Sequence, residues 1–228
     1  MTSVRVGLPD SGCGAALGAH VDASAAFVSA EDGAVEQQVA GPDRAGHGTA
    51  LAEIVVMQAP AARLLIAQIF GLRATTSAEA AAVGIDWLVE SGADILSISF
   101  GLREDRAALR EACARALGEG RIVLASSPAR GEPVFPAAYP GVLRITGDAR
   151  CGADEISVLG TAQADFGACV RAAHGRGASF AVPHVAGLLA AYLAEGGDRR
   201  PQAVRDHLSA VARFHGPERK TWSDVGGA

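Results

Sequence analysis

The sequence contains no asparagine, few aromatic residues and no long apolar segment. Aromatic side chains make up only 5% of the 228 residues. No apolar run approaches the ~20 residues that a membrane-spanning helix requires. Residues 1–6 (MTSVRV) also lack the apolar segment of a secretory signal. We therefore expect a cytoplasmic protein with no membrane partner.

The sequence is also poor in cysteine and has no cluster of basic residues. No two of its four cysteines (Cys13, Cys113, Cys151 and Cys169) have the close spacing of a zinc site. A chain of this length needs no disulfides to build a core, so we expect free thiols, no metal and no cofactor. A formal net charge of −5 argues against a nucleic-acid partner.

Apolar residues, in contrast, are present in the amount typical of a folded protein. Hydrophobic residues make up 49% of the chain and charged residues 20%. A length of 228 residues favours one domain over two. We therefore expect residues 1–228 to form a single domain.

Short apolar runs alternate with helical patterns along the chain. Strands are predicted at residues 4–8, 63–70, 94–100, 121–125 and 142–146. Helices are predicted at 47–58, from the capping-box pattern TSAE (76–79) to about residue 90, and at 105–117, 179–195 and 201–214. This alternation indicates an α/β fold of three layers, in which helices cover both faces of a mainly parallel sheet.

Two of the predicted helices, 47–58 and 179–195, are small or apolar on almost every face, which places them inside the molecule. Each begins with a residue of reactive type, His47 or Ser179, and Asp10 follows the first predicted strand. Catalytic groups of parallel sheets gather at the carboxyl ends of the strands. A serine hydroxyl is a weak nucleophile that needs an adjacent base, which a third group must orient. Ser179, His47 and Asp10 supply these three groups.

The segments around these residues resemble the signature blocks of the subtilisin-like serine proteases, the subtilases. Residues 10–12 (DSG) match Asp-Ser/Thr-Gly, and 47–49 (HGT) match His-Gly-Thr-His-Val-Ala-Gly before the two sequences diverge. Residues 177–187 (GASFAVPHVAG) are similar to Gly-Thr-Ser-Met-Ala-x-Pro-His-Val-Ala-Gly. The resemblance covers nearly the whole chain and implies a subtilisin-like catalytic domain without a prodomain.

In such a serine endopeptidase, the resemblance makes Asp10 the orienting acid, His47 the general base and acid, and Ser179 the nucleophile. His184 belongs to the third block and is expected to be structural. The resemblance further implies that a peptide substrate pairs with Ser99, Phe100 and Gly101 as an added strand. It places Ala125, Ser126 and Ser127 in the wall of the pocket for the residue before the scissile bond.

The oxyanion hole departs from the family pattern. The N–H group of Ser179 is implied as one donor, but the second donor of the family is an Asn, and Ala129 stands at that position here. Because the sequence has no asparagine, the candidates for a replacement donor are Ser126, Ser127, Arg130 and Gln163. In subtilisin itself, loss of this donor slows turnover roughly 100- to 1,000-fold.

A slow protease without a prodomain is expected to be selective, with one precursor peptide or leader segment as its partner. The chain resembles compact maturation proteases encoded with modified-peptide systems, such as the protease that trims the small subunit of quinohemoprotein amine dehydrogenases. One alternative is a catalytically weak or dead subtilase fold that serves as a peptide-binding scaffold. Another is a dinucleotide-binding oxidoreductase, because residues 12–18 (GCGAALG) loosely resemble a phosphate-binding loop with one residue too many.

Overall fold

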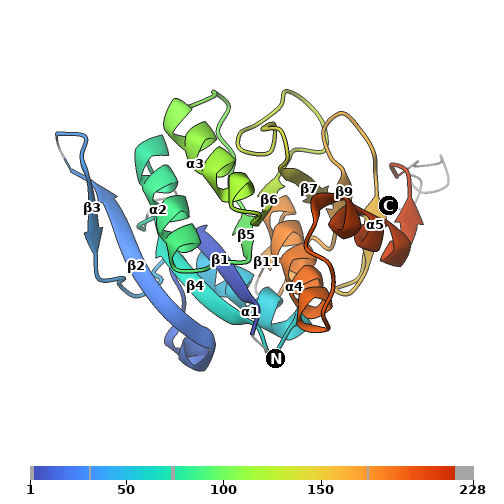
Figure 1. Ribbon diagram of the computed structural model, residues 1–228, viewed down its shortest axis with the longest axis horizontal. Helices are drawn as coiled ribbons and strands as arrows, with labels where there is room; N and C mark the ends of the chain where they lie inside the picture. Colours follow the sequence, from blue (N-terminus) through green and yellow to red (C-terminus); the bar gives the residue numbers. More distant parts are fainter. Residues whose placement is uncertain (1–2, 31, 73–74, 174, 219–228) are drawn as a thin grey trace, which may run out of the picture.

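A ten-stranded sheet with the order β12-β8-β9-β7-β6-β5-β1-β4-β2-β3 runs through the middle of the protein (Figure 1). The computed structural model describes residues 3–30, 32–72, 75–173 and 175–218; both ends of the predicted domain, 1–2 and 219–228, lie outside them. The strands of this sheet are β1 (Arg5–Asp10), β2 (Val21–Ser29), β3 (Val35–Gln38), β4 (Arg63–Gln68), β5 (Ile95–Ile98), β6 (Ile122–Ser126), β7 (Leu143–Gly147), β8 (Ile156–Val158), β9 (Phe166–Ala168) and β12 (Phe214–His215). Antiparallel pairing joins β2 to β3 and β8 to β9, and the other pairs are parallel.

Helices lie on both faces of the sheet. They are α1 (His47–Gln58), α2 (Ala78–Glu90), α3 (Ala107–Gly118), α4 (Ala181–Ala194) and α5 (Pro201–Val211), with short 3₁₀ helices η1 (Ala15–His20) and η2 (Ala178–Phe180). A small hairpin of β10 (Arg171–Ala172) and β11 (Gly175–Arg176) precedes η2. The predicted fold class, a three-layer α/β architecture with a mainly parallel sheet, is therefore confirmed.

Alternate residues of each central strand face opposite layers, as the two-residue period of a strand requires. In β4, Leu64 and Ile66 belong to the core that includes residues of α1, α4 and α5, whereas Leu65 and Ala67 belong to the core that includes residues of α2 and α3. These residues are almost completely buried, and burying one such leucine or isoleucine contributes roughly 1.5–3 kcal/mol. The apolar character of α1 and α4, predicted from the sequence, fits their place in the first of these two cores.

Strand β1 lies where the strand order of the sheet reverses: β4 and β2 lie on one side of it, and β5, β6 and β7 lie on the other. It pairs with β4 on one side and with β5 on the other, both in parallel. From β5 the chain continues outward to β6 and β7. In open parallel sheets, the crevice outside the carboxyl end of such a strand is where ligands bind. Asp10 is the last residue of β1 and so lies at that end of the strand.

The last two predicted helices have different ends in the structure. Helix α5 ends at Val211, not at Phe214, because Phe214 pairs with Ser157 of β8 and its ring lies 5.1 Å from the guanidinium carbon of Arg150. The helix predicted from Ser179 begins as an α-helix only at Ala181, preceded by the turn η2. The capping-box pattern also acts one residue later than predicted, since the N-cap of α2 is Ser77.

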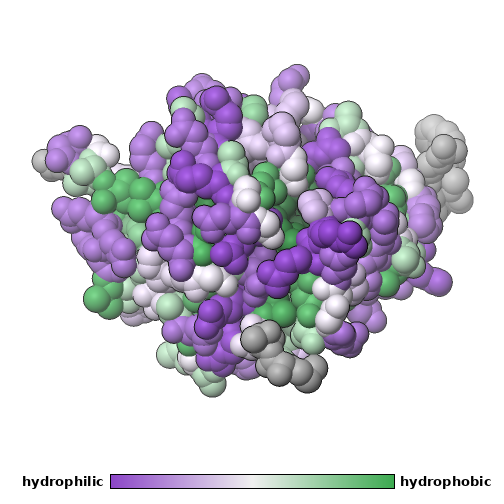
Figure 2. Space-filling view, in the orientation of Figure 1, coloured by the Kyte–Doolittle hydropathy of each residue, from purple (hydrophilic) through white to green (hydrophobic). Residues whose placement is uncertain are grey.

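The surface in Figure 2, seen in the orientation of Figure 1, is mainly hydrophilic, and its hydrophobic residues form small separate groups. Within the described ranges, no helix combines the length and apolar character needed to cross a membrane.

Candidate active site

Asp10 is held in one orientation at the carboxyl end of β1. Its carboxylate is buried, with only 2% of the residue exposed. Its Oδ1 accepts hydrogen bonds from the backbone N–H of Ser11 at 2.8 Å and from the Ser11 hydroxyl at 3.2 Å. A buried carboxylate needs such donors to replace the hydrogen bonds that water would supply. The side chain of Ser11 thus orients Asp10.

Two glycines allow helix α1 to approach the end of β1. A Cβ atom on Gly48 would lie 2.2 Å from the backbone oxygen of Gly12, closer than any real contact. Gly12 itself has φ +119°, in the region that favours glycine, and a Cβ there would lie 2.9 Å from Gln68 Nε2. The His-Gly and Asp-Ser-Gly motifs therefore have a packing role. They bring His47, the first residue of α1, beside Asp10.

The start of α1 is fixed by Asp43. Its Oδ2 accepts bonds from the N–H and the hydroxyl of Thr49 at 2.8 and 2.6 Å, and its Oδ1 accepts the N–H of Gly46 at 2.8 Å. Burial opposes ionisation of Asp43, but the bonds from Thr49 and Gly46 outweigh burial and lower the pKa of this carboxyl. Its charge therefore occupies the positive end of the helix. Gly46, with φ 73°, makes the turn that this capping requires.

His47 connects Asp10 to Ser179. Its Nδ1 lies 2.8 Å from Asp10 Oδ1, and its Nε2 lies 3.1 Å from Ser179 Oγ. In the tautomer that satisfies both contacts, Nδ1–H donates to Asp10 and Nε2 accepts from the serine hydroxyl. The hydrogen bond to Asp10 raises the pKa of His47, burial opposes this shift, and the charges of Asp10 and Asp43 add to it. The ring of Phe180, with its centroid 5.6 Å from that of His47, packs beside the imidazole.

Ser179 lies in the turn η2, immediately before α4. Pro183 falls in the first turn of α4, where a backbone N–H has no partner within the helix, so its missing donor costs little. The backbone oxygen of Ser179 accepts a bond at 3.0 Å from the buried hydroxyl of Ser99. A Cβ atom on Gly147 would lie 3.2 Å from Ala178 Cα, so the end of β7 also supports the turn.

Three of the residues predicted to contact substrate, Ser99, Ala125 and Ser127, direct their side chains to other parts of the protein. Ser99 uses its side chain to hold Ser179, and the side chain of Ala125 belongs to the core beneath α2 and α3. The hydroxyl of Ser127 is buried and donates to the backbone oxygen of Gln163 at 2.6 Å. Its only proton is therefore in use, which corrects the expectation that this hydroxyl could donate to an oxyanion.

Of the remaining predicted positions, Phe100, Gly101 and Ala129 lie on loops at the same edge of the sheet, and Ser126 is the last residue of β6. Phe100 is half-buried and meets Phe70 edge to face, with ring centroids 5.6 Å apart. A Cβ atom on Gly101 would lie 2.9 Å from Val134 Cγ2, so that loop permits only glycine without movement. Ser126 is half-buried, and Ala129 is exposed.

Two supporting residues were not identified from the sequence. Asp43, which caps α1, could have been recognised as an acid shortly before the His47 helix. Gln68 gave no such signal, because its role depends on the fold. It donates from Nε2 to the Ser11 oxygen at 2.8 Å and accepts the Gly41 N–H at 2.8 Å through Oε1, so it connects the segment after β1 to the segment before α1.

His184 has the structural role that was expected of it. Burial lowers its pKa, which keeps the ring neutral. Its Nε2 contacts the Arg171 oxygen at 3.1 Å and its Nδ1 contacts Gln58 Nε2 at 3.2 Å. The Gln58 amide also donates to the backbone oxygen of Ala153. This network joins the end of α1 to the start of α4.

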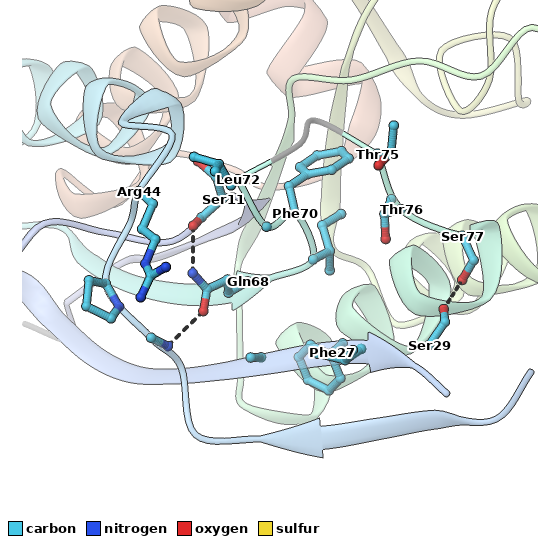
Figure 3. A pocket seen from close by; sticks show the side chains of 16 residues that line it. Ser11, Phe27, Ser29, Arg44, Gln68, Phe70, Leu72, Thr75, Thr76 and Ser77 are labelled. Atoms are coloured by element: carbon cyan, nitrogen blue, oxygen red, sulfur yellow. Dashed lines mark hydrogen bonds between the residues drawn. The ribbon is translucent and has the colours of Figure 1, made fainter. Parts of the chain in front are cut away.

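A pocket of about 710 Å³ opens beside Ser11, whose side chain is hydrogen-bonded to Asp10 (Figure 3). Ser11, Arg44 and Gln68 lie at one end, and Ser29 and Ser77, hydrogen-bonded through their hydroxyls at 2.7 Å, lie at the other. The wall between them is mostly apolar and comes from β2 and from the segment after β4: Phe27, Val28, Ile69, Phe70 and Leu72. Ser11 thus belongs both to this pocket and to the hydrogen bonds that orient Asp10.

The glycine-rich segment after β1 forms no phosphate-binding loop. It leads into η1, a 3₁₀ helix with no buried residue, whereas a dinucleotide site needs an α-helix whose N-terminus faces the phosphates. A Cβ atom on Gly14 would lie 3.0 Å from the Thr49 side chain, so this segment packs against α1.

An acid, an imidazole and a serine hydroxyl in hydrogen-bonded order, at the carboxyl edge of a parallel sheet, define the site of a serine hydrolase. The sequence matches the model of Peptidase_S8, the subtilase family, over residues 2–222. The chain therefore belongs to the subtilase family of serine peptidases.

Three curated proteins illustrate this similarity. Subtilisin DY of Bacillus licheniformis is 27% identical over 244 residues, which cover 92% of this chain and 84% of that protein. M-protease of Shouchella clausii is 24% identical over 233 residues, covering 92% of this chain and 59% of that protein. The major intracellular serine protease of Bacillus subtilis is 27% identical over 221 residues, covering 82% of this chain and 67% of that protein.

Proposed function

We propose that this chain is a serine endopeptidase that cleaves a specific peptide segment through an acyl-enzyme on Ser179. The observation that supports this proposal is the hydrogen-bonded series Asp10–His47–Ser179, with contacts of 2.8 and 3.1 Å. Membership of the subtilase family supports the same reaction class.

In the proposed reaction, Ser179 Oγ attacks the scissile carbonyl carbon while its proton passes to His47 Nε2. Asp10 holds Nδ1–H and stabilises the imidazolium that forms. The Ser179 N–H donates to the oxyanion. His47 then gives its proton to the leaving amine as the C–N bond breaks. Water, deprotonated by His47, next attacks the acyl ester, and His47 returns that proton to Ser179 Oγ as the ester C–O bond breaks and the new carboxyl end is released.

A fluorophosphonate probe tests the nucleophile directly. The wild-type protein is expected to gain the mass of one phosphonyl group, which peptide mapping places on Ser179. Ser179→Ala removes the acceptor and is expected to gain nothing. His47→Ala keeps the acceptor but lacks the base, so its labelling is expected to be much slower. Labelling of Ser179→Ala at the wild-type rate would contradict the assignment.

We further propose that the natural substrate is one precursor or leader peptide cleaved during maturation. Support comes from Ala129 at the position of the second oxyanion donor, together with the Ser127 hydroxyl already bound to Gln163. Weaker oxyanion stabilisation makes general proteolysis slow, so substrate binding must contribute more to the rate. We expect slow cleavage of casein and of unfolded cell extract. Rapid cleavage of both would rule out the maturation role.

The alternative function is that of a peptide-binding scaffold with a weak or inactive site. The same Ala129 position favours it. The labelling experiment separates the two functions, because a scaffold without a working nucleophile would bind peptides and remain unlabelled at Ser179.

We also propose that the protein acts in the cytoplasm. The described residues contain four cysteines, all free, as expected in a reducing compartment. Burial raises the pKa of Cys113 and Cys151 to about 12 each, so neither thiol is reactive at neutral pH. The test is to fractionate the cells that produce the protein. Recovery of the protein outside the cytoplasmic fraction would contradict this location.

A further inference from the structure

Arginines without an acidic partner gather around the candidate active site. Within the described part of the chain, five arginines form no ion pair with a described acid: Arg44, Arg103, Arg130, Arg171 and Arg176. All five lie beyond the carboxyl ends of parallel strands or just before α1, at the edge of the sheet that carries Asp10, His47 and Ser179. The other arginines that the structure describes are paired, including Arg5, Arg63 and Arg121 at the opposite edge.

This distribution opposes the overall charge of the protein, which is −5. Acidic residues at the same edge offset much of the positive charge of the five arginines: Asp10 and Asp43 are hydrogen-bonded in the site, Glu53 and Glu132 are exposed without an ion pair to a described base, and Glu218 lines a pocket with Arg130. An effect on ligands is therefore expected from an individual arginine that lines a pocket, because its charge attracts an anionic group at close range.

Arg44 is the arginine closest in sequence to His47 that also lines the pocket beside the site. It is exposed, and Figure 3 shows it at the end of the pocket formed by Ser11 and Gln68. Gln68 bonds to the Ser11 oxygen and the Gly41 N–H, and the guanidinium of Arg44 has no ion pair with a described acid, so it is available to a ligand. A planar guanidinium matches a carboxylate with two parallel hydrogen bonds.

The apolar wall of the same pocket adds a second requirement. Leu72 is 73% exposed and Val28 is 47% exposed, and both line the pocket. Exposed apolar side chains grouped in a pocket indicate a surface that a ligand covers.

We propose that the substrate segment is acidic, with a carboxylate that pairs with Arg44 and an apolar side chain that covers Leu72 and Val28. This inference rests on the proposed peptidase function and names its substrate class. Arg130, on the loop after β6, and Arg176, in β11 just before η2, attract the same acidic segment over a longer range.

Binding to Ser179→Ala tests the inference without cleavage. The probes are fluorescent heptapeptides made of alanine and one leucine. At each of the alanine positions in turn, the alanine is replaced by Glu, Gln or Lys. At one of these positions and at 20 mM salt, the peptide with Glu is expected to bind about fivefold more tightly than the peptide with Gln, and the peptide with Lys more weakly than both. At 500 mM salt the difference should nearly disappear.

Variants assign the preference to Arg44. Adding Arg44→Gln to Ser179→Ala should remove the preference for Glu, and Arg44→Lys should retain part of it. Arg200→Gln, which removes an equal charge at the start of α5, is the matched control and should leave the preference intact. Equal binding of Glu and Gln peptides, a preference that survives Arg44→Gln, or no binding of any peptide would overturn the inference.

The result of this binding experiment can be distinguished from the result of the labelling experiment that tests the proposed function. Fluorophosphonate labelling of Ser179 does not depend on peptide charge. A protein that labels but shows no preference for Glu keeps the hydrolase function and loses this inference. A protein that prefers Glu but never labels keeps the acidic ligand and loses the hydrolysis.

Discussion

Small side chains determine the geometry of the site as much as the three polar residues do. Gly12 and Gly48 let two backbones meet, and without that contact His47 would not reach Asp10. The sequence could suggest the three reactive residues, because each stands in a motif with a known pattern. It could not show that Ser11 orients Asp10, or that the Ser127 hydroxyl is bound to Gln163. Those contacts join residues whose proximity exists only in the folded chain.

Gly48→Ala is expected to damage both folding and activity. The new Cβ atom would lie 2.2 Å from the Gly12 oxygen, so α1 must move away from β1. We expect the free energy of unfolding to fall by about 2–4 kcal/mol and kcat/KM by roughly 100-fold. Urea denaturation and peptide hydrolysis measure the two effects. Gly118→Ala, whose added Cβ atom would meet no neighbouring element within 4 Å, is the control and should cause neither loss.

The pH dependence of kcat/KM should depend on Asp43. Only neutral His47 can accept the serine proton, and its pKa is raised from 6.5, mainly by the hydrogen bond to Asp10. The acid limb of the profile is therefore expected above pH 6.5. Asp43→Asn removes a negative charge that also raises this pKa, so the limb should move to lower pH. An unchanged limb, or the same movement in the control Glu90→Gln on α2, would contradict this account.

At the level of elements, the central strands and the five helices were predictable, and most strands at the sides of the sheet were not. Strands β1, β4, β5, β6 and β7 are apolar runs, because both faces are covered. Strand β3, with the sequence VEQQ, has three exposed residues and exists only through its pairing with β2. Strands β8 to β12 have two or three residues each, too few for a periodic pattern.

Ser99, which follows β5, is hydrogen-bonded to the turn η2, whereas Ser97 within β5 is not. Replacing these two serines is therefore expected to affect activity differently. Ser99→Ala removes the bond to the Ser179 oxygen, so we expect kcat/KM to fall about tenfold and stability by about 1 kcal/mol. Ser97 is equally buried two residues earlier, but its hydroxyl has no partner among the described residues. Ser97→Ala should therefore leave kcat/KM unchanged and stability equal or higher. Equal loss of activity in both variants would refute the role of Ser99.

For the whole molecule, the sheet order separates a stable centre from a less stable edge. Strands β1, β4 and β5 are covered on both faces by the two large cores, whereas β2 and β3 end the sheet with many exposed residues. Hydrogen exchange measured by mass spectrometry should show the slowest exchange in β1 and β5 and much faster exchange in β3. Faster exchange in β1 than in β3 would contradict the described packing.

The central claim, an acyl-enzyme on Ser179, is tested most directly by trapping the acyl group. The protein is mixed with p-nitrophenyl acetate, quenched in acid within seconds, and analysed by mass spectrometry for bound acetyl. The account predicts one acetyl group on the peptide that contains Ser179 in the wild type, and none on the corresponding peptide of Ser179→Ala. A wild-type protein that releases nitrophenol no faster than Ser179→Ala, and carries no acetyl at Ser179, would contradict the account.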